Sequence, residues 1–146
     1  MAKLGNKRKF YLVVSEGANS TTYTWLAGEQ TNSFNRTADA IEVSDKETDW
    51  KKFIYGIKGA TAEVTVFTDD ESTSPQKAFL KALHEGQTVK CFCGELNTGN
   101  TPSPSEGDAF EAIVNAVSDT NDNGAVATRN LSLTVTDEVT HYPAFN

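Results

Sequence analysis

Period-two alternation of apolar and polar residues is the feature that most limits what this chain can fold into. Ala62, Val64 and Val66 alternate with Glu63 and Thr65, and successive side chains of an extended strand point to opposite faces of a sheet. We therefore expect the first three side chains in a core and the other two outside it. Further extended segments are expected at residues 10–15, 22–26, 40–43, 52–57, 60–68, 88–96, 110–117 and 125–135. The sequence predicts a mainly β fold with about seven or eight strands.

A single helix is expected at residues 75–85. Ser74 is a favoured N-cap, and Pro75 suits the first helical position, where its missing N–H leaves no partner unsatisfied. Gly86 can end the helix in the left-handed conformation. Apolar residues recur at helical spacing between these ends, so the helix is expected to lie against an apolar surface.

The dipeptide Asn123 and Gly124 predicts the turn of a closing hairpin, because both residue types accept positive φ. With Asp119 and Asn121 it also matches the first half of a calcium-binding loop, D-x-[DN]-x-[DN]-G. The last ligand position of such a loop would be Asn130 rather than a bidentate glutamate, and strands rather than helices flank it. We therefore favour the turn and expect no metal ion.

Length and composition indicate one unit. The chain has 146 residues, with no internal repeat and no shift in composition. We expect one domain, residues 1–146, with a basic N-terminal arm at 1–9 and mobile loops at 44–52 and 97–107. No apolar run reaches the length of about 18 residues that a spanning helix needs, and no apolar stretch of an export signal follows the arm. We expect synthesis in the cytoplasm and no membrane partner.

Charge is unevenly distributed along the chain, whose net charge is −7. Lys3, Lys7, Arg8 and Lys9 are four of its 13 basic residues, which leaves nine basic against 20 acidic residues on the rest. An acidic body repels phosphates, which disfavours a conventional DNA- or RNA-binding protein. The basic arm of one copy can still attract the acidic body of another.

Candidate catalytic side chains are few. Cys91 and Cys93 share a face of a predicted strand with Cα atoms about 7 Å apart, at the outer limit for a disulfide. We interpret them as small buried hydrophobic residues in a reducing compartment. His84 and His141 have no neighbouring nucleophile motif, and His84 at a helix end fits the helix dipole. No nucleotide-binding fingerprint is present, so we expect neither an enzyme nor a cofactor.

The order of motifs along the chain resembles one family. Residues 34–56 contain I-E-V-S-D-K, an acidic spacer, then W-K-K-F and a glycine before a new strand. The helix follows, and the closing hairpin contains N-A-V-S-D-T-N-D-N-G-A-V-A-T-R-N-L-S-L-T-V-T. Over roughly residues 25–142 this order resembles the major tail tube proteins of long-tailed, non-contractile bacteriophages, the TP901-1-like group. The end of the chain, D-E-V-T-H-Y-P, departs from the glycine-containing close of many such proteins.

This resemblance implies an antiparallel β-sandwich or split barrel flanked by one α-helix. Members of the family form hexameric rings that stack into a tube, through which the DNA genome passes without specific binding. A self-assembling virion protein of a siphophage tail, with a role in genome ejection, is therefore implied. The tape measure, tail terminator and distal tail proteins are implied as partners.

The resemblance makes the loop at 44–52 a candidate for contacts between rings. Mixed charges surround one large aromatic residue, Trp50, as in an interface hot spot with a polar rim; the sequence leaves open that Trp50 instead packs into its own core. The candidate contact residues between rings or subunits are Lys3, Lys7, Arg8, Lys9, Asp45, Lys46, Glu47, Asp49, Trp50 and Lys51. Strand alternation gives the candidate lumen-facing residues Glu63, Thr65, Glu111 and Asn115.

Two other classes of function stay open. In a β-sandwich module that binds a carbohydrate or a receptor, Trp25 and Trp50 would be exposed stacking platforms. In a small hydrolase, His84 or His141 would have to meet a carboxylate in the folded chain. Neither class is excluded by the sequence.

Overall fold

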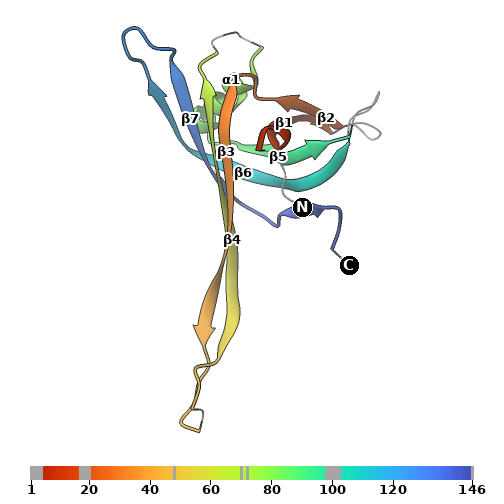
Figure 1. The fold of residues 1–146 in the computed structure, drawn as a ribbon, viewed down its shortest axis with the longest axis vertical. Coiled ribbons are helices and arrows are strands. Elements are labelled where there is room, and N and C mark those ends of the chain that lie inside the picture. The colour runs from red at the N-terminus through yellow and green to blue at the C-terminus, as the bar shows by residue number, and fades with distance from the viewer. Residues whose placement is uncertain are drawn as a thin grey trace.

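The computed structural model describes residues 5–16, 21–47, 49–69, 71, 73–97 and 103–145. These residues form one antiparallel sheet of eight strands, one α-helix and a short 3-10 helix (Figure 1). The strands are β1 (Lys9–Glu16), β2 (Thr21–Trp25), β3 (Glu29–Glu42), β4 (Phe53–Phe67), β5 (Thr88–Leu96), β6 (Pro104–Thr120), β7 (Thr128–Val135) and β8 (Thr140–Tyr142). The helix α1 is Pro75–Glu85, and the 3-10 helix η1 is Gly5–Lys7. No helix among these residues is long and apolar enough to cross a membrane.

The sheet curls around a core instead of lying flat. Its strand order is β2-β1-β5-β6-β7-β4-β3, and β8 pairs with β6 beyond the end of β7. The curl brings β3 back towards β1, where Asn32 Nδ2 donates a hydrogen bond to the backbone carbonyl of Arg8 at 3.0 Å. The predicted sandwich or split barrel flanked by one helix is confirmed.

Strand β4 shows the predicted alternation. Ala62, Val64 and Val66 are at most 1% exposed, whereas Glu63 is exposed and Thr65 half-buried. The pattern follows from the pleat, since alternate side chains meet the core and the outer face. The same parity holds in β6, where the core positions predicted by alternation are all buried: Phe110, Ala112 and Val114.

Helix α1 begins and ends where the sequence predicts. Ser74 Oγ accepts a hydrogen bond from the backbone N–H of Gln76 at 3.3 Å. Gly86 adopts the left-handed conformation, with φ 70°, and its N–H donates to the carbonyl of Ala82. Phe79 is fully buried, with its ring centroid 6.3 Å from that of Phe10 on β1. The helix therefore closes the core against the concave side of the sheet.

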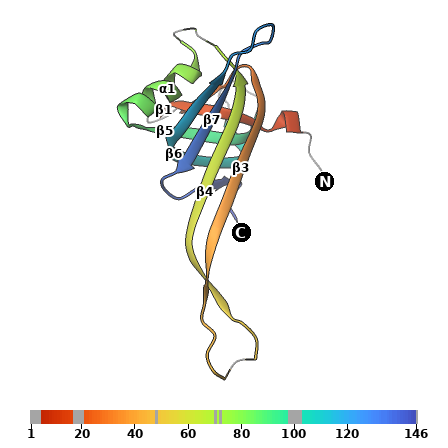
Figure 2. The ribbon, with the colours of Figure 1, turned by 90° about the vertical axis from the view of Figure 1, so that its left-hand side faces the viewer.

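The extended segments predicted at 40–43, 52–57 and 60–68 lie almost entirely in strands, but the break predicted between 52–57 and 60–68 is wrong, because both belong to β4. The segment 40–42 ends β3, which pairs with β4 in one long hairpin. Strand β3 has 14 residues and β4 has 15, and the hairpin extends far beyond the rest of the sheet in two perpendicular views (Figures 1 and 2). Gly56 lies inside β4, where a Cβ atom would be 3.0 Å from the Cβ of Asp39. The glycine thus allows a close approach of β3 and β4 and does not end a strand.

The predicted loop at 97–107 is shorter than expected. Residues 98–102 lie outside the described part, but β6 already begins at Pro104 and Gly107 is buried. Gly107 is paired with Gly94 on β5, and a Cβ atom on Gly94 would be 2.1 Å from the carbonyl oxygen of Glu106. Gly107, which was assigned to the predicted loop, and Gly94, in the predicted strand at 88–96, therefore permit close pairing of β5 and β6.

The chain ends also differ from expectation. Residues 1–4, which include Lys3, lie outside the described part. The arm was predicted to reach residue 9, but β1 already begins at Lys9. The short strand β8 was not predicted at all. Residues 44–47 and 49–52 do form the tip of the long hairpin, where the backbone N–H of Lys52 donates to Ser44 Oγ at 2.7 Å.

Candidate assembly surfaces

One face of four neighbouring strands is dominated by polar side chains. Strands β6, β7, β4 and β3 lie side by side (Figure 2), and Ser33, Glu63 and Ser132 stand opposite one another on the side away from the core. On the same face the amide of Asn115 donates to the hydroxyl of Thr134. Three of the four residues predicted to face a lumen belong to this outer face: Glu63, Thr65 and Asn115. Glu111 has the same parity on β6 as Asn115 but lies next to the layer, where β6 pairs with Lys90 on β5. Their place in a lumen stays a prediction.

This four-stranded layer has an open edge on each side, within the described residues. Strand β3 pairs with β4 only. Strand β6 pairs with β5 as far as Ile113, so its stretch 114–120 has β7 on one side and no strand on the other. Unpaired N–H and C=O groups of an edge strand are a template for another strand.

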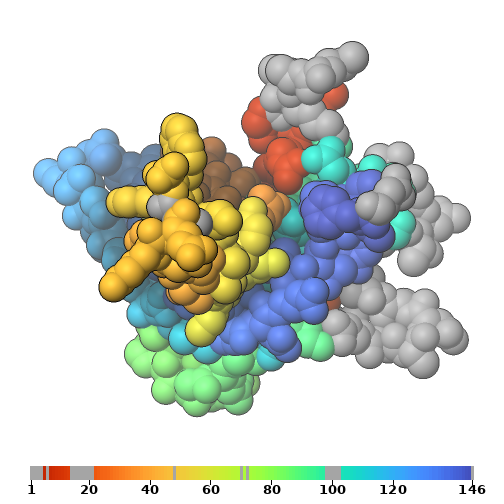
Figure 3. Space-filling model, turned by 90° about the horizontal axis from the view of Figure 1, so that it is seen from below, coloured from red at the N-terminus to blue at the C-terminus, as the bar shows by residue number. Residues whose placement is uncertain are grey.

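The hairpin extension, residues 38–58, carries most of the exposed large apolar side chains. Seven of the 13 found among the described residues lie in it. Trp50 is 84% exposed, Tyr55 81% and Ile57 83%. The alternative that Trp50 packs into the core of its own subunit is therefore wrong. Figure 3 looks along the extension towards the body, with the atoms of the extension in front, and Figures 1 and 2 show how far the extension projects.

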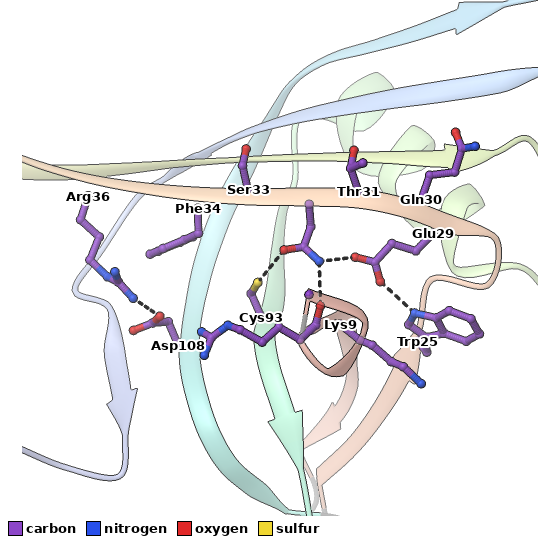
Figure 4. Close-up of a pocket in the computed structure, with 13 residues that line it drawn as sticks. Lys9, Trp25, Glu29, Gln30, Thr31, Ser33, Phe34, Arg36, Cys93 and Asp108 are labelled. Carbon is purple, nitrogen blue, oxygen red and sulfur yellow. Dashed lines mark hydrogen bonds and ion pairs between the residues drawn. The ribbon is translucent and has the colours of Figure 1, made fainter. Parts of the chain in front are cut away.

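An open pocket of about 800 Å³ lies between β1, β3 and β6 (Figure 4). Glu29 accepts hydrogen bonds at one carboxylate oxygen from the indole N–H of Trp25 at 2.9 Å and the backbone N–H of Phe10 at 3.1 Å. Asn32 accepts from the thiol of Cys93 at 3.4 Å. These polar groups are therefore used to join β3 to β1 and β5.

Asp108 connects three elements at the edge of this pocket. Its side chain is 3% exposed; one oxygen pairs with Arg36 on β3, and the other lies 2.9 Å from His141 Nδ1 on β8. Phe145 stacks on the His141 ring with centroids 4.4 Å apart. His141 thus meets a carboxylate, as a hydrolase would require, but Arg36 holds the same carboxylate in an ion-pair cluster that links elements.

The remaining candidate groups for chemistry are occupied or inert. Cys91 and Cys93 are free and buried, and burial raises the pKa of Cys93 to about 11. Asp119, the first position of the calcium-loop pattern, pairs with Arg129 Nε at 2.7 Å. No group of three or more His, Cys, Asp or Glu side chains that could hold a metal occurs among the described residues. His84 is exposed at the end of α1.

The predicted contact residues fall into two separate groups. Asp45, Lys46, Glu47, Asp49, Trp50 and Lys51 lie together at the exposed hairpin tip. Arg8 and Lys9 lie on the body, where Arg8 pairs with Glu106 and the Lys9 ammonium is 4.8 Å from the Trp25 ring centroid. Lys7 is exposed in η1. The contact role of both groups stays a prediction.

Sequence reasoning missed the apolar part of the extension and the Asp108 cluster. The run F-I-Y-G-I at 53–57 was visible, but it was read only as a strand. A continuous apolar run fits burial by the chain's own fold as well as burial by a partner. Arg36 and His141 lie 72 and 33 residues from Asp108 in sequence, and no local motif marks their contact.

Together, the fold and these surfaces define a mainly β subunit with open sheet edges and an exposed apolar extension. The chain belongs to the phage tail tube protein family, whose model matches residues 5–141. It is therefore a structural component of virion tails and not an enzyme, as the sequence predicted. No curated protein matches the sequence.

Solved structures of assembled particles share the fold. A subunit in the tail of an empty gene transfer agent particle, computed with helical refinement and C6 symmetry, has a TM-score of 0.74 at 12% identity over 96% of this chain and 98% of that one. The SPP1 tail tube gives 0.73 at 15% identity, over 97% of this chain and 80% of that one. The anti-feeding prophage baseplate gives 0.67 at 10% identity, over 97% and 95%.

Proposed function

We propose that copies of this chain form hexameric rings that stack into a tail tube through which the DNA genome passes. The observation that carries this proposal is the four-stranded layer with an open edge on each side. Ring closure satisfies both edges, because each β3 edge then finds the β6 edge of the next copy. Strand directions alternate across the layer, so a neighbour rotated about the tube axis presents β3 antiparallel to β6.

The polar face of this layer suits a passage for DNA. Its rows consist mainly of hydroxyl and amide side chains, with Glu63 in the rows and Glu111 next to them as acidic groups. Such a surface offers little to bind phosphates and repels them at the carboxylates. We therefore assign this face to the lumen. Hexameric closure is supported by the C6 symmetry of the structurally similar gene transfer agent tail.

Stacking of rings is assigned to the hairpin extension and its tip, with the basic residues near the N-terminus as a second contact. The exposure of Trp50 and its surrounding charges supports this assignment. The tape measure, tail terminator and distal tail proteins would then meet the two ends and the interior of the tube. The domain is proposed to span residues 1–146 as one unit.

Electron microscopy of the purified chain tests the proposal directly. Negative staining is expected to show six-fold rings with a central hole, or tubes, at high protein concentration, and size exclusion is expected to show large species. Assembly that depends on the arm and the acidic body should weaken at high salt, since salt screens exposed charges. A strictly monomeric species at millimolar concentration would contradict the proposal.

A carbohydrate- or receptor-binding module remains a second candidate, favoured by the exposure of Trp25 and Trp50, at 40% and 84%. Tryptophan fluorescence separates the two functions. Quenching by members of a sugar panel supports the module, whereas a blue shift on polymerisation supports the tube, because assembly moves the indole rings out of water.

A further inference from the structure

Two opposite flanks of the four-stranded layer carry groups of opposite charge. In Figure 2, α1 lies beyond β6 on one flank, and η1 lies beyond β3 on the other. The turn from η1 into β1, residues 7–9, consists of three basic residues and is called the basic turn here. The loop before α1 contains Asp69 and Glu71 among the described residues and is called the acidic loop. When the layer closes a ring, the first flank of one copy faces the second flank of the next.

The basic turn is attached to the open edge strand β3. Asn32 Nδ2 donates to the backbone carbonyl of Arg8 at 3.0 Å. The guanidinium of Arg8 pairs with Glu106, and the Lys9 ammonium lies over an aromatic ring of its own subunit. Lys7 is exposed, and its side chain has no hydrogen bond or ion pair within the part of the chain that the structure describes. Lys7 is therefore the cation of this turn that is available to another chain.

The acidic loop is attached to the other open edge, the stretch 114–120 of β6. The buried side-chain oxygen of Gln76, in the first turn of α1, accepts from the backbone N–H of Asp69 at 3.1 Å and from Arg129 Nη1 at 3.2 Å. Arg129 Nε donates in turn to Asp119 on β6 at 2.7 Å. Glu71 is exposed, and its side chain has no partner among the described residues. Each open edge therefore holds one charged side chain that its own subunit leaves unpaired.

The two attachments lie at the same level of the layer. Two rows of directly paired residues cross it from β3 to β6. The first row is Asn32, Val64, Leu131 and Val117, and the second is Glu29, Val66, Arg129 and Asp119. The residues of β3 that hold the basic turn are therefore level with the residues of β6 that hold the acidic loop. Lateral pairing of β3 with the β6 of the next copy brings the two charged groups together behind the sheet.

We propose that, within a ring, the basic turn of each copy docks against the acidic loop of the next copy, with Lys7 paired to Glu71. This inference rests on the proposed ring, and it gives the basic residues near the N-terminus a partner in that ring. The two lysines of α1, Lys77 and Lys81, line a pocket beside β1 and β2 that includes no residue of β6. Opposite charges across a contact speed association and select its register, so this pair directs β3 to the correct edge.

Exchange of the two charges gives the first test. Lys7→Glu and Glu71→Lys each place like charges in the contact, and each is expected to raise the protein concentration needed for ring formation about fivefold. Both sites are exposed, so the subunits should stay folded by circular dichroism. The double variant restores an opposite pair and is expected to assemble like the unsubstituted chain. Lys81→Glu changes the net charge equally and should not rescue Glu71→Lys. Failure of the double variant to recover assembly would overturn the pairing.

Photo-crosslinking locates the contact independently of charge. Benzoylphenylalanine replaces Lys7 in a labelled chain, which is assembled with a large excess of unsubstituted chain. Mass spectrometry of the labelled dimer is expected to find the crosslink within residues 68–76 of the other copy. Rings that give crosslinks only to the hairpin extension, or none from position 7, would refute the inference. Failure of the unsubstituted chain to form rings would instead refute the proposed function.

Discussion

Replacing the buried Asp108 by Asn should destabilise the isolated subunit more than an Asp→Asn change at an exposed site does. The carboxylate is buried and receives Arg36 at one oxygen and His141 at the other. The amide oxygen of Asn can still accept from Arg36, and its NH2 group can donate to His141 Nδ1 when the imidazole carries its proton on Nε2. The change thus removes the negative charge that pairs with Arg36 and the acceptor for an N–H at His141 Nδ1.

The size of the effect follows from the exposure of the partners. Breaking a buried ion pair costs about 3–5 kcal/mol when both partners are inaccessible to water. Here the Arg36 side chain is 55% exposed and that of His141 27%, so both can be partly rehydrated. We therefore expect a loss of about 2–3 kcal/mol in the free energy of unfolding.

Urea denaturation of the monomer at pH 7, followed by circular dichroism, measures this loss. With a slope of about 2 kcal/mol/M, the midpoint should fall by about 1–1.5 M. Asp122→Asn, in the exposed turn between β6 and β7, is the matched control and should change stability by less than about 0.5 kcal/mol. Equal midpoints for the two variants would show that the Asp108 cluster contributes nothing to the fold.

Three further predictions concern the tip, the polar face and the thiols. Trp50→Ala should leave a folded subunit, since the side chain is 84% exposed, but should abolish the growth of tubes seen by electron microscopy. Normal tube growth by this variant would show that Trp50 is not needed for the contact between rings. Replacing both Glu63 and Glu111 by Lys should change the free energy of unfolding by less than about 0.5 kcal/mol per site. The new positive charges should bind phosphates and so slow the passage of the genome. A phage with both changes that ejects its DNA at the normal rate would place these residues outside the lumen. Because burial raises the pKa of Cys93 to about 11 and also raises that of Cys91, neither thiol should react with Ellman's reagent at pH 8 until urea unfolds the chain. The unfolded thiols ionise first, so the free energy of unfolding should also fall as pH rises above about 8.5; a stability that is flat to pH 10 would contradict the raised values.

The parts of the fold that could be predicted are those where the spacing of apolar residues in the sequence matches the side chains that the fold buries. The 60–67 half of β4 alternates because one side meets the core, and α1 carries its own caps in Ser74 and Gly86. The first half of β3 has no such signal, since polar residues follow one another on a strand that is largely exposed. The extension lost its alternation because both faces are apolar. The contacts of the Asp108 cluster were missed because they are distant in sequence. The apolar faces of the extension were missed because no contact within their own subunit buries them.

The candidate site divided in the same way. The outer-face positions Glu63 and Thr65 followed from parity alone, because the pleat leaves no other choice. The charged residues at 44–52 indicated a loop at the surface. The Arg36, Asp108 and His141 cluster could not be predicted, because it depends on how far the sheet curls and on where β8 returns to β6.

The polar pocket explains how a long hairpin can transmit a contact made at its tip. An extension fixed only by its own β3–β4 pairing would bend at its root, since an isolated two-stranded ribbon is marginally stable. In a closed barrel, backbone hydrogen bonds would join β3 to β1, but here side chains of β3 make the connection. The Glu29 carboxylate accepts from the backbone N–H of Phe10, and the Asn32 amide donates to the carbonyl of Arg8. Arg36 adds the pair with Asp108 at the next point along β3. These bonds hold the root of the hairpin against the body. In the proposed tube, a ring that contacts the extension would therefore be held in register with the sheet that we assign to the lumen.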